Sequence, residues 1–431
     1  MRGSFPRPFY GWWIIAASII LVWSSASVVA YGFPVLISPI QSEFGWGTPV
    51  LALAFSLRSQ VRSLGAIPAG FLVDRYGSRA MIACGIFIAG LGFLFLSRID
   101  SHLTLYAAFI VISIGGSLCN PSIPQVSVAK WFTRWRTRAL TIQAVGQGFG
   151  GLTAPLLAFL VDKFGWRGGL VALTTISWSM AAPVLLTYRD RPEPYGMLPD
   201  GVRPEEAGAT TEQTTSRRRA LPPSGPQMTV REVVTNRRFW HLLGASTLHG
   251  LGSTPVMTLL VAGLLVDGIE PSMAFMTFAS IPLVSIPGRL VFGWWGDKFD
   301  KRKVIAFSYT MQAIGLIILA NATSPLLLAA FVLTYASSSG GTGTLTTSLQ
   351  VDFFGTRAMG SVHGLLQGFA ILDTMVAPIF VAFLADLLGS YRLPWLVLSV
   401  CMVLAIPVLL TTPRALPATV VPSAVSEDPK P

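Results

Sequence analysis

Long apolar stretches recur along the chain and are separated by short polar or charged segments. A transmembrane α-helix needs about 20 consecutive, mostly apolar residues to cross a bilayer. The stretches are close to that length, so we expect a helix in each. The pattern predicts twelve membrane-spanning helices, at residues 11–37, 49–73, 80–97, 103–128, 138–161, 168–187, 240–265, 272–295, 304–321, 325–349, 361–386 and 393–411.

A charged loop motif occurs twice, each time between two apolar stretches. The first copy reads GFLVDRYGSR and begins at Gly70, and the second reads GWWGDKFDKRK and begins at Gly293. Asp297 lies 223 positions after Asp74, as Gly293 does after Gly70. Two matching loops half a chain apart indicate two homologous halves. In a membrane protein, paired halves are typical of a carrier that rocks around a central site.

The composition and the placement of charge support a membrane protein. Hydrophobic residues make up 52% of the chain and charged residues 12%, whereas soluble domains carry about 25% charged residues. If the N-terminus is cytoplasmic, the inner segments hold 24 Lys and Arg and the outer loops hold four. Cytoplasmic loops retain Lys and Arg, so both termini are expected inside. The net charge of +11 is then a topology signal, and no nucleic-acid partner is expected.

One segment, residues 189–238, is rich in Pro and Arg and cannot bury enough apolar surface to fold alone. It divides the chain into an N-terminal six-helix half (1–188), a cytoplasmic linker (189–238), a C-terminal six-helix half (239–414) and a cytoplasmic tail (415–431). The three cysteines all lie in predicted spans, and the four histidines have no metal-site spacing. No GxxxxGK[ST] phosphate loop occurs. We therefore expect no metal, no cofactor and no enzyme.

The duplicated loop and the twelve spans resemble the major facilitator superfamily over nearly the whole chain. That family carries a G-x-x-x-D-R-x-G-x-R loop between spans two and three, often echoed between spans eight and nine. The resemblance implies an all-α membrane protein with two pseudo-symmetric bundles, in which these loops stabilise the outward-facing state through charge contacts. The alternative is that the charges only anchor helix ends. The residues that match the motif are Gly70, Asp74, Arg75, Gly77, Arg79, Gly293, Asp297 and Lys298.

A finer resemblance is to the monocarboxylate transporters and their oxalate:formate antiporter relatives. Residues 131–139 are similar to the loop before the fifth helix of those carriers, and 164–168 reads FGWRG as theirs does. The segment IPGRLVFG resembles their eighth helix, whose Arg binds the substrate carboxylate, and Arg289 is the matching residue. Two departures exist: Ser285 replaces an acidic proton-coupling residue, and Val35 replaces a substrate-binding Lys. The coupling residues of those carriers therefore cannot be carried over.

Charged residues inside a membrane span are costly and usually functional. Four lie well within the predicted spans: Arg58, Arg62, Arg289 and Asp373. At 1.5 Å per residue, Arg62 and Asp373 lie roughly 18 Å and Arg289 roughly 12 Å from a helix end. Three positive charges against one favour an anionic ligand, and the planar guanidinium matches a carboxylate. The alternatives are an Arg289–Asp373 salt bridge, and for Arg58 and Arg62 an outer vestibule or capping of carbonyls.

Asp373 is the candidate for proton coupling. Desolvation raises the pKa of a buried carboxyl, and a neighbouring Arg lowers it. Substrate binding to Arg289 would free the Asp373 carboxylate to take up a proton, and a purely structural role is the alternative. Other polar residues within the spans are candidates either for the pocket or for helix–helix hydrogen bonds. The predicted pocket set is completed by Tyr31, Asn120, Gln147, His249 and Gln367.

The sequence therefore predicts a secondary transporter that works by alternating access and moves a small organic anion, in first place a monocarboxylate, with a proton. Two alternatives stay open: anion exchange of the oxalate:formate type, and export of a hydrophobic drug or metabolite. A sensor or scaffold is disfavoured because no folded signalling domain is evident. The expected partners are the anion, the proton and the lipid bilayer, and the protein is expected to be a monomer. Its expected location is a prokaryotic cytoplasmic membrane, with both termini in the cytoplasm.

Overall fold

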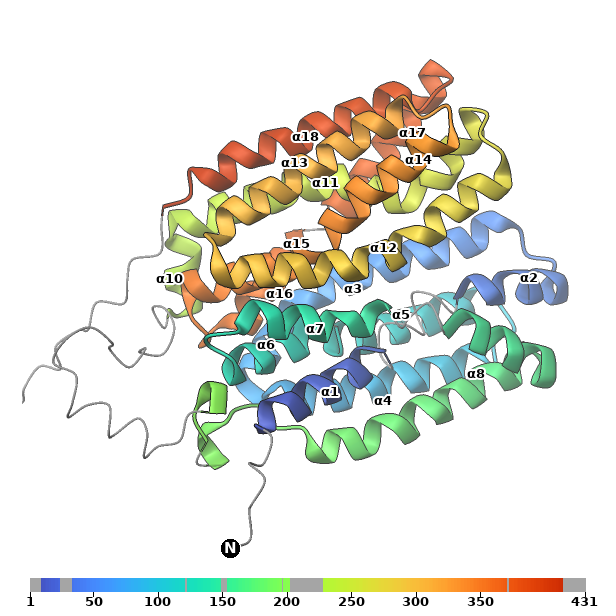
Figure 1. The fold of residues 1–431 in the computed structure, drawn as a ribbon. Helices are drawn as coiled ribbons and strands as arrows, with labels where there is room; N and C mark the ends of the chain where they lie inside the picture. Colours follow the sequence, from blue (N-terminus) through green and yellow to red (C-terminus); the bar gives the residue numbers. More distant parts are fainter. Residues whose placement is uncertain are drawn as a thin grey trace, which may run out of the picture.

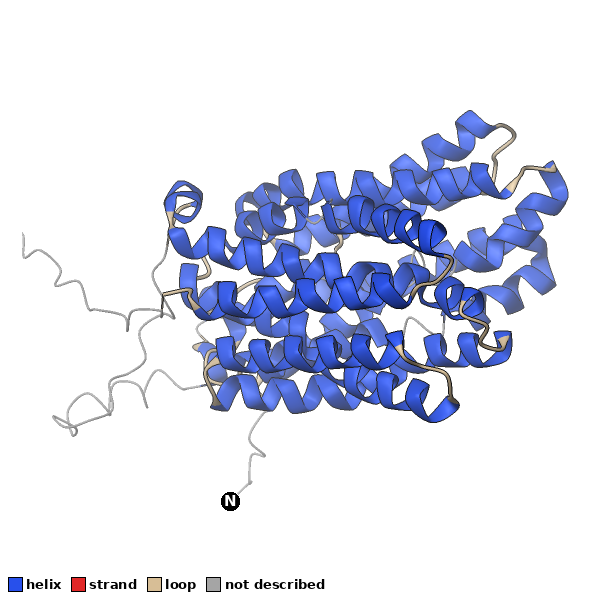
Figure 2. Ribbon diagram, turned by 90° about the horizontal axis from the view of Figure 1, so that it is seen from above, coloured by secondary structure: helices blue, strands red, loops and turns tan. Residues whose placement is uncertain are grey.

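Every regular element in the described part of the chain is a helix (Figure 2). This is the arrangement that hydrocarbon requires, because a helix satisfies its own backbone N–H and C=O groups. Eight of the described helical segments are long and apolar enough to cross a membrane. A computed structural model gives the structure, and it describes residues 9–23, 33–120, 122–148, 153–195, 197–201, 228–369 and 372–413.

The N-terminal half contains the helices of the first six predicted spans. Gly165 has a φ of +68°, a conformation that glycine adopts readily, and it breaks α8 between the predicted fifth and sixth spans. The elements are α1 (Tyr10–Val22), α2 (Phe33–Phe44), α3 (Thr48–Tyr76), α4 (Ser78–Leu96), α5 (His102–Leu118), α6 (Ser122–Trp131), α7 (Arg136–Gly148) and α8 (Thr153–Thr187).

The C-terminal half contains the helices of the last six predicted spans. Two of these spans include a π-helical turn, a feature that is rare and is frequently found at functional sites. The elements are α11 (Arg237–Val266), α12 (Pro271–Lys298), α13 (Lys301–Ala320), α14 (Pro325–Phe331), η5 (Val332–Ala336), α15 (Ser337–Phe354), α16 (Met359–Phe369), η6 (Leu372–Val376), α17 (Ala377–Leu388) and α18 (Arg392–Leu410).

The two ends of the predicted linker are helical and pack on the halves. The first end holds η3 (Glu193–Tyr195) and η4 (Pro199–Gly201), and the second holds α10 (Val230–Thr235). Asp200 accepts hydrogen bonds from the backbone N–H groups of Thr133 and Arg134, at 3.1 and 2.7 Å. These segments differ from the expectation for 189–238 because they use the surfaces of the halves as partners. Residues 202–227 and the tail lie outside the described residues.

The two halves lie one on the other, with α1–α8 below and α11–α18 above in Figure 1. We call the end that carries α10, η3 and η4 the linker end, and the opposite end the far end. The halves meet chiefly where α3 packs on α16 and α12 packs on α7. The apolar core of the N-terminal half at the linker end also takes in Val351 and Met359 of the other half. The two cores are therefore joined at that end.

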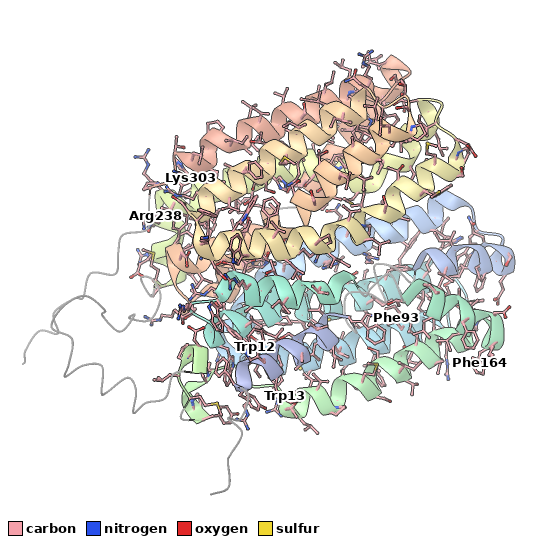
Figure 3. The ribbon with its side chains drawn as sticks, in the orientation of Figure 1. Trp12, Trp13, Phe93, Phe164, Arg238 and Lys303 are labelled. Carbon is pink, nitrogen blue, oxygen red and sulfur yellow. The ribbon has the colours of Figure 1, made fainter. Side chains whose placement is uncertain are left out.

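Large apolar side chains cover the outside of the bundle. Trp12, Trp13 and Phe164 are 42%, 61% and 61% exposed, and Figure 3 shows all three on the lower half. Arg238 and Lys303 lie at the linker end in the same view. An apolar surface this extensive is the surface of a membrane-embedded protein, because soluble monomers rarely expose large contiguous apolar patches.

Candidate functional site

Asp74, the aspartate of the first motif copy, binds the start of α16 in the opposite half. Its carboxylate accepts hydrogen bonds from the backbone N–H of Gly360 at 2.9 Å and from that of Ser361 at 2.7 Å. The Ser361 hydroxyl donates a third hydrogen bond at 2.6 Å. The first N–H groups of a helix have no partner within the helix, and its N-terminus carries partial positive charge. The Asp74 carboxylate, from the other half, accepts hydrogen bonds from these N–H groups and also balances the partial positive charge.

Asp297 makes the same contact in the second copy. It accepts hydrogen bonds from the backbone N–H of Thr137 at 2.9 Å and of Arg138 at 3.2 Å, at the start of α7. Thr137 precedes Gly360 by 223 positions, the offset that also separates the two aspartates. The repeat in the sequence therefore corresponds to two equivalent contacts across the halves, related by the pseudo-symmetry of the fold. We call these contacts the clasps: the carboxylate of Asp74 on the start of α16, and that of Asp297 on the start of α7.

Small residues let the backbones approach closely next to each clasp. A Cβ added to Gly360 would lie 2.7 Å from the Gly70 carbonyl oxygen and 2.8 Å from Asp74 Oδ1. One added to Gly364 would meet the carbonyl oxygen of Ala66. Gly293 on α12 faces a threonine of α7 in the same way. Both helix pairs thus rely on glycine at the points of contact, as closely packed membrane helices commonly do.

An ionic cluster lies beside the clasps at the linker end. Asp352 of α15 pairs with Arg136 of the opposite half at 3.0 Å and with Lys301 of its own half at 2.5 Å. Arg136 is 3% exposed. Burial lowers its pKa from the ordinary value, and the carboxylates of Asp352, Asp200 and Asp297 oppose that shift. The cluster holds a buried cation between the halves with carboxylates around it.

Two neutral hydrogen bonds between the halves complete this closure. Thr347 donates to the side-chain oxygen of Gln125 at 3.0 Å, and the hydroxyls of Thr137 and Ser348 are 3.1 Å apart. All four side chains are buried. The halves are therefore closed on each other at the linker end, by backbone clasps, an ion pair and buried hydroxyl contacts.

The remaining motif residues are placed around helix ends within one half. Arg75 lies over the ring of Tyr76 and Lys298 over that of Trp294, at 5.3 and 4.7 Å from the ring centroids. Gly77 has a φ of +85°, which favours glycine at the turn between α3 and α4. The backbone N–H of Arg79 donates to Asp190 at 2.9 Å. These contacts suit the anchoring of helix ends, whereas the two aspartates connect the halves.

The three arginines within the spans occupy different positions. Arg289 reaches across the interface, and its Nη1 donates to the Ala144 carbonyl oxygen of α7 at 2.6 Å. Arg58 is 6% exposed and Arg62 is half-buried. The backbone carbonyl of Arg62 accepts a hydrogen bond from Ser117 at 3.2 Å. One partner of Arg289 is thus a backbone group of the other half, and no Arg289–Asp373 ion pair occurs among the described residues.

A cavity of about 560 Å³ lies in the C-terminal half, between α11, α13, α15, α16 and the two π-helical turns. Of the predicted residues, His249, Gln367 and Asp373 line it. A second cavity, of about 20 Å³, lies between the halves and is lined by Asn120 and Gln367. In the part of the chain that the structure describes, Gln367 lines both cavities, Asn120 lines only the smaller one, and the three arginines line neither. Tyr31 and the side chain of Gln147 lie outside the described residues.

Asp373 lies in the π-helical turn η6, at the wall of the larger cavity. It is 7% exposed, and its carboxyl group packs directly against Gly250 of α11, where a Cβ would overlap it. Its Oδ1 is buried and has no hydrogen-bond partner among the described residues. An ionised carboxylate in that position lacks the hydrogen bonds that normally stabilise the charge.

Hydrogen bonds order the polar side chains of this cavity. Gln312 contacts His249 Nε2 at 3.0 Å and donates to Ser308 at 3.0 Å. His249 stacks on the ring of Tyr309, with centroids 4.2 Å apart. These neighbours were not predicted from the sequence, nor were His363 and Gln350, which lie 3.1 Å apart. A search of the sequence for every amide or imidazole side chain within an apolar stretch would have identified these residues as candidates.

A helical membrane bundle whose two halves close at one end beside a polar cavity has the architecture of a transporter. The sequence profile of the Major Facilitator Superfamily matches residues 12–280 and 242–430, which together cover nearly the whole chain. The chain belongs to the Major Facilitator Superfamily, a family of transporters and not an enzyme class. The prediction of an all-α membrane protein with twelve helices in two pseudo-symmetric halves is confirmed.

Several relatives match along nearly their whole length. Monocarboxylate transporter 12 of Rattus norvegicus is 24% identical, over 93% of this chain and 85% of its own. Monocarboxylate transporter 13 of Bos taurus is 22% identical, over 96% and 92%. Among solved structures, the transporter FucP in the outward conformation has a TM-score of 0.69 at 16% identity, covering 93% of this chain and 98% of its own. The last similarity concerns the fold alone.

Proposed function

We propose that this transporter carries a small organic anion, in first place a monocarboxylate, together with a proton. Asp373 carries the proposal, because its carboxyl group is buried at the cavity wall with one oxygen lacking a partner among the described residues. Such a group is stable when protonated and costly when ionised. Arg289, which reaches across the interface between the halves, is proposed to supply the positive charge for the anion. The names of the relatives support a monocarboxylate.

The linker end is proposed to face the cytoplasm. The described residues there include Arg136, Arg138, Lys301 and Arg302, whereas the far end holds few bases. Cytoplasmic segments are the ones that retain Lys and Arg. With that orientation, the conformer is closed to the cytoplasm. The clasps of Asp74 and Asp297 then stabilise the outward-facing state, as the resemblance implied.

Arg289 gives the proposed route from substrate binding to opening. Its guanidinium must leave the Ala144 carbonyl before α12 and α7 can separate. A substrate carboxylate presents two acceptors to the guanidinium and is a stronger partner than a neutral carbonyl. Substrate binding would therefore release the contact between the halves at the level of the site. If Asp373 is protonated during this conformational change, the protein does not have to keep a negative charge buried while the halves move.

The test is uptake of labelled lactate, pyruvate, acetate, oxalate and formate into proteoliposomes, with and without an inward proton gradient. Accumulation that requires the gradient, is lost in Asp373→Asn and persists in Asp386→Asn supports proton symport. Asp386 is exposed on α17 and is the matched control. Exchange of substrate should survive in Asp373→Asn. Uptake only after preloading with an anion would replace symport with exchange, and uptake of none of the acids would refute a small carboxylate substrate.

Arg289→Lys tests the anion site separately. Lys keeps the positive charge but loses the planar fork that pairs with a carboxylate. We expect a rise in the KM for the acid of at least about tenfold, the effect of losing roughly one charged hydrogen bond. Arg392→Lys, on an exposed residue at the far end, is the control. An unchanged KM in Arg289→Lys would remove this residue from the anion site.

A further inference from the structure

The cavity in the C-terminal half is lined almost entirely by polar side chains. Nine Ser or Thr, three Gln, two His and two Tyr line it, against one Met and one Leu among the described residues. Asp373 is the one lining residue of the described set with a formal charge. Hydroxyl, amide and imidazole groups can both donate and accept hydrogen bonds, so they suit a ligand that does the same.

The lining hydroxyls present acceptors to the cavity. Ser253, Ser339 and Thr346 each donate to a backbone carbonyl of their own helix, at 3.5, 3.1 and 2.9 Å. Their oxygen lone pairs remain available, because each hydroxyl has one hydrogen and two acceptor sites. A ligand that donates from several hydroxyl groups is complementary to such a wall. A simple carboxylate, which only accepts, is not.

Two polar groups at the wall still need a partner. Ser246 Oγ and Asp373 Oδ1 are buried and have no hydrogen-bond partner among the described residues. Both line the cavity, from α11 and from η6. An unsatisfied buried polar atom costs free energy, and a bound ligand can supply the missing hydrogen bonds. Both atoms are shielded in this conformer, so a ligand hydroxyl can donate to Asp373 or accept from Ser246 once the side chain turns toward the cavity.

The size of the cavity exceeds what a three-carbon acid requires. A water molecule takes up about 30 Å³ in the liquid, so six non-hydrogen atoms, as in lactate, need at most about 180 Å³ at that density. The cavity measures about 560 Å³. Thirteen non-hydrogen atoms, as in a six-carbon hydroxy acid, need about 390 Å³ on the same basis. The cavity is therefore large enough for a ligand about twice the size of lactate, with space left for water.

We propose that the transported anion is a polyhydroxylated carboxylic acid of about six carbons, whose hydroxyl groups occupy the cavity of the C-terminal half. The juxtaposition of ordered Gln312 and His249 with unpartnered Ser246 and Asp373 carries the inference. It rests on the proposed function for the carboxylate, which Arg289 would bind at the interface between the halves. It goes further by assigning the hydroxyl-binding part of the site.

The test measures equilibrium binding to the purified full-length protein by calorimetry. Three probes are used: gluconate, lactate, and sorbitol, which has the hydroxyls without the carboxylate. Gluconate is expected to bind at least about tenfold more tightly than either of the others, since each loses one class of contact. Equal affinity for gluconate and lactate, or no binding of gluconate, overturns the inference. Sorbitol binding as tightly as gluconate keeps the hydroxyl site and instead refutes the anion function.

Variants of the wall make the test specific. Gln312→Met removes an amide of the cavity at similar volume, and Ser246→Ala is a smaller change that protects against misfolding. Each should reduce gluconate affinity at least about fivefold more than lactate affinity, the loss expected from one hydrogen bond. Thr310→Val, on an exposed face of the same helix as Gln312, is the matched control. Equal losses for both ligands in both variants would overturn the assignment.

Discussion

The clasp of Asp74 on α16 should control the balance between the closed and open linker end. Asp74→Asn keeps one side-chain oxygen but replaces the other by an amide that cannot accept from the Ser361 N–H, 2.7 Å away. Losing about one charge-assisted hydrogen bond costs roughly 1.5–3 kcal/mol. Loss of the charge at a helix N-terminus adds about 0.3–1 kcal/mol. Opening the linker end would break this contact, so we expect the whole loss of about 2–4 kcal/mol to shift the equilibrium between conformers.

A shift of that size is large enough to see directly. It changes the ratio of closed to open molecules by roughly 30- to 700-fold. Spin labels at Ala80 and Lys303, both exposed at the linker ends of opposite halves, report the separation by double electron–electron resonance. The three native cysteines are replaced first. Asp74→Asn should add or enlarge a longer-distance population.

The matched control is Asp190→Asn. Asp190, at the start of the linker, accepts from the Arg79 N–H at 2.9 Å and from the Ser127 hydroxyl at 3.3 Å, and both donors belong to the N-terminal half. Its replacement removes comparable hydrogen bonds without touching the interface. The reasoning is refuted if the distance distribution of Asp74→Asn matches that of the unsubstituted protein, or if Asp190→Asn changes it equally.

Three further outcomes are expected. Gly364→Ala forces a methyl group against backbone and should shift the same distance distribution toward the open form, whereas Gly244→Ala, whose added Cβ has 3.7 Å to its nearest neighbour, should not. Asp352→Asn removes the carboxylate that pairs with the buried Arg136 and should lower the free energy of unfolding. The expected loss is about 1–3 kcal/mol, less than for a fully buried pair, because Asp352 is itself partly exposed. A melting temperature equal to that of Gly244→Ala would contradict this prediction. Hydrogen bonds from Arg167 and Trp166 lower the pKa of Glu43 in the folded protein. The stability that this contact contributes is therefore present above the unfolded pKa of about 4.3 and is lost as pH falls through the lower folded pKa. Tryptophan fluorescence should show a pH transition below about 4.3, and this transition should be absent in Glu43→Gln.

The positions of several helices could be read from the sequence to within a few residues, although the predicted span 11–37 ends seven residues before α2 does. The predicted span 49–73 corresponds to α3 at Thr48–Tyr76, and 272–295 corresponds to α12 at Pro271–Lys298. Span length follows from bilayer thickness and the cost of burying charge, which are properties of a segment by itself. The duplicated motif also predicted two equivalent halves, since a repeated loop at a fixed offset needs no three-dimensional information.

The partners of the candidate site residues were not predictable in the same way. The sequence offered Asp373 or a substrate as the partner of Arg289, and the structure gives a backbone carbonyl 145 residues away in the chain. Which face of α12 meets α7 depends on the crossing of the two halves, and this is set by many weak contacts. The π-helical turn that holds Asp373 also shifts the register of its span, and the hydrophobic pattern carries no mark of it.

The contacts between the halves differ in what can replace them when the linker end opens, and this difference bears on the proposed role of the substrate. Asp74 and Asp297 hold backbone N–H groups at helix starts, which water can solvate once the linker end opens. Arg289 lies deeper, where low dielectric makes the loss of a hydrogen bond from a guanidinium costly. Its Ala144 contact therefore cannot be exchanged for water as cheaply as the clasps can. An anion bound to Arg289 removes that cost, so opening without cargo is disfavoured by the same residue that is proposed to bind it.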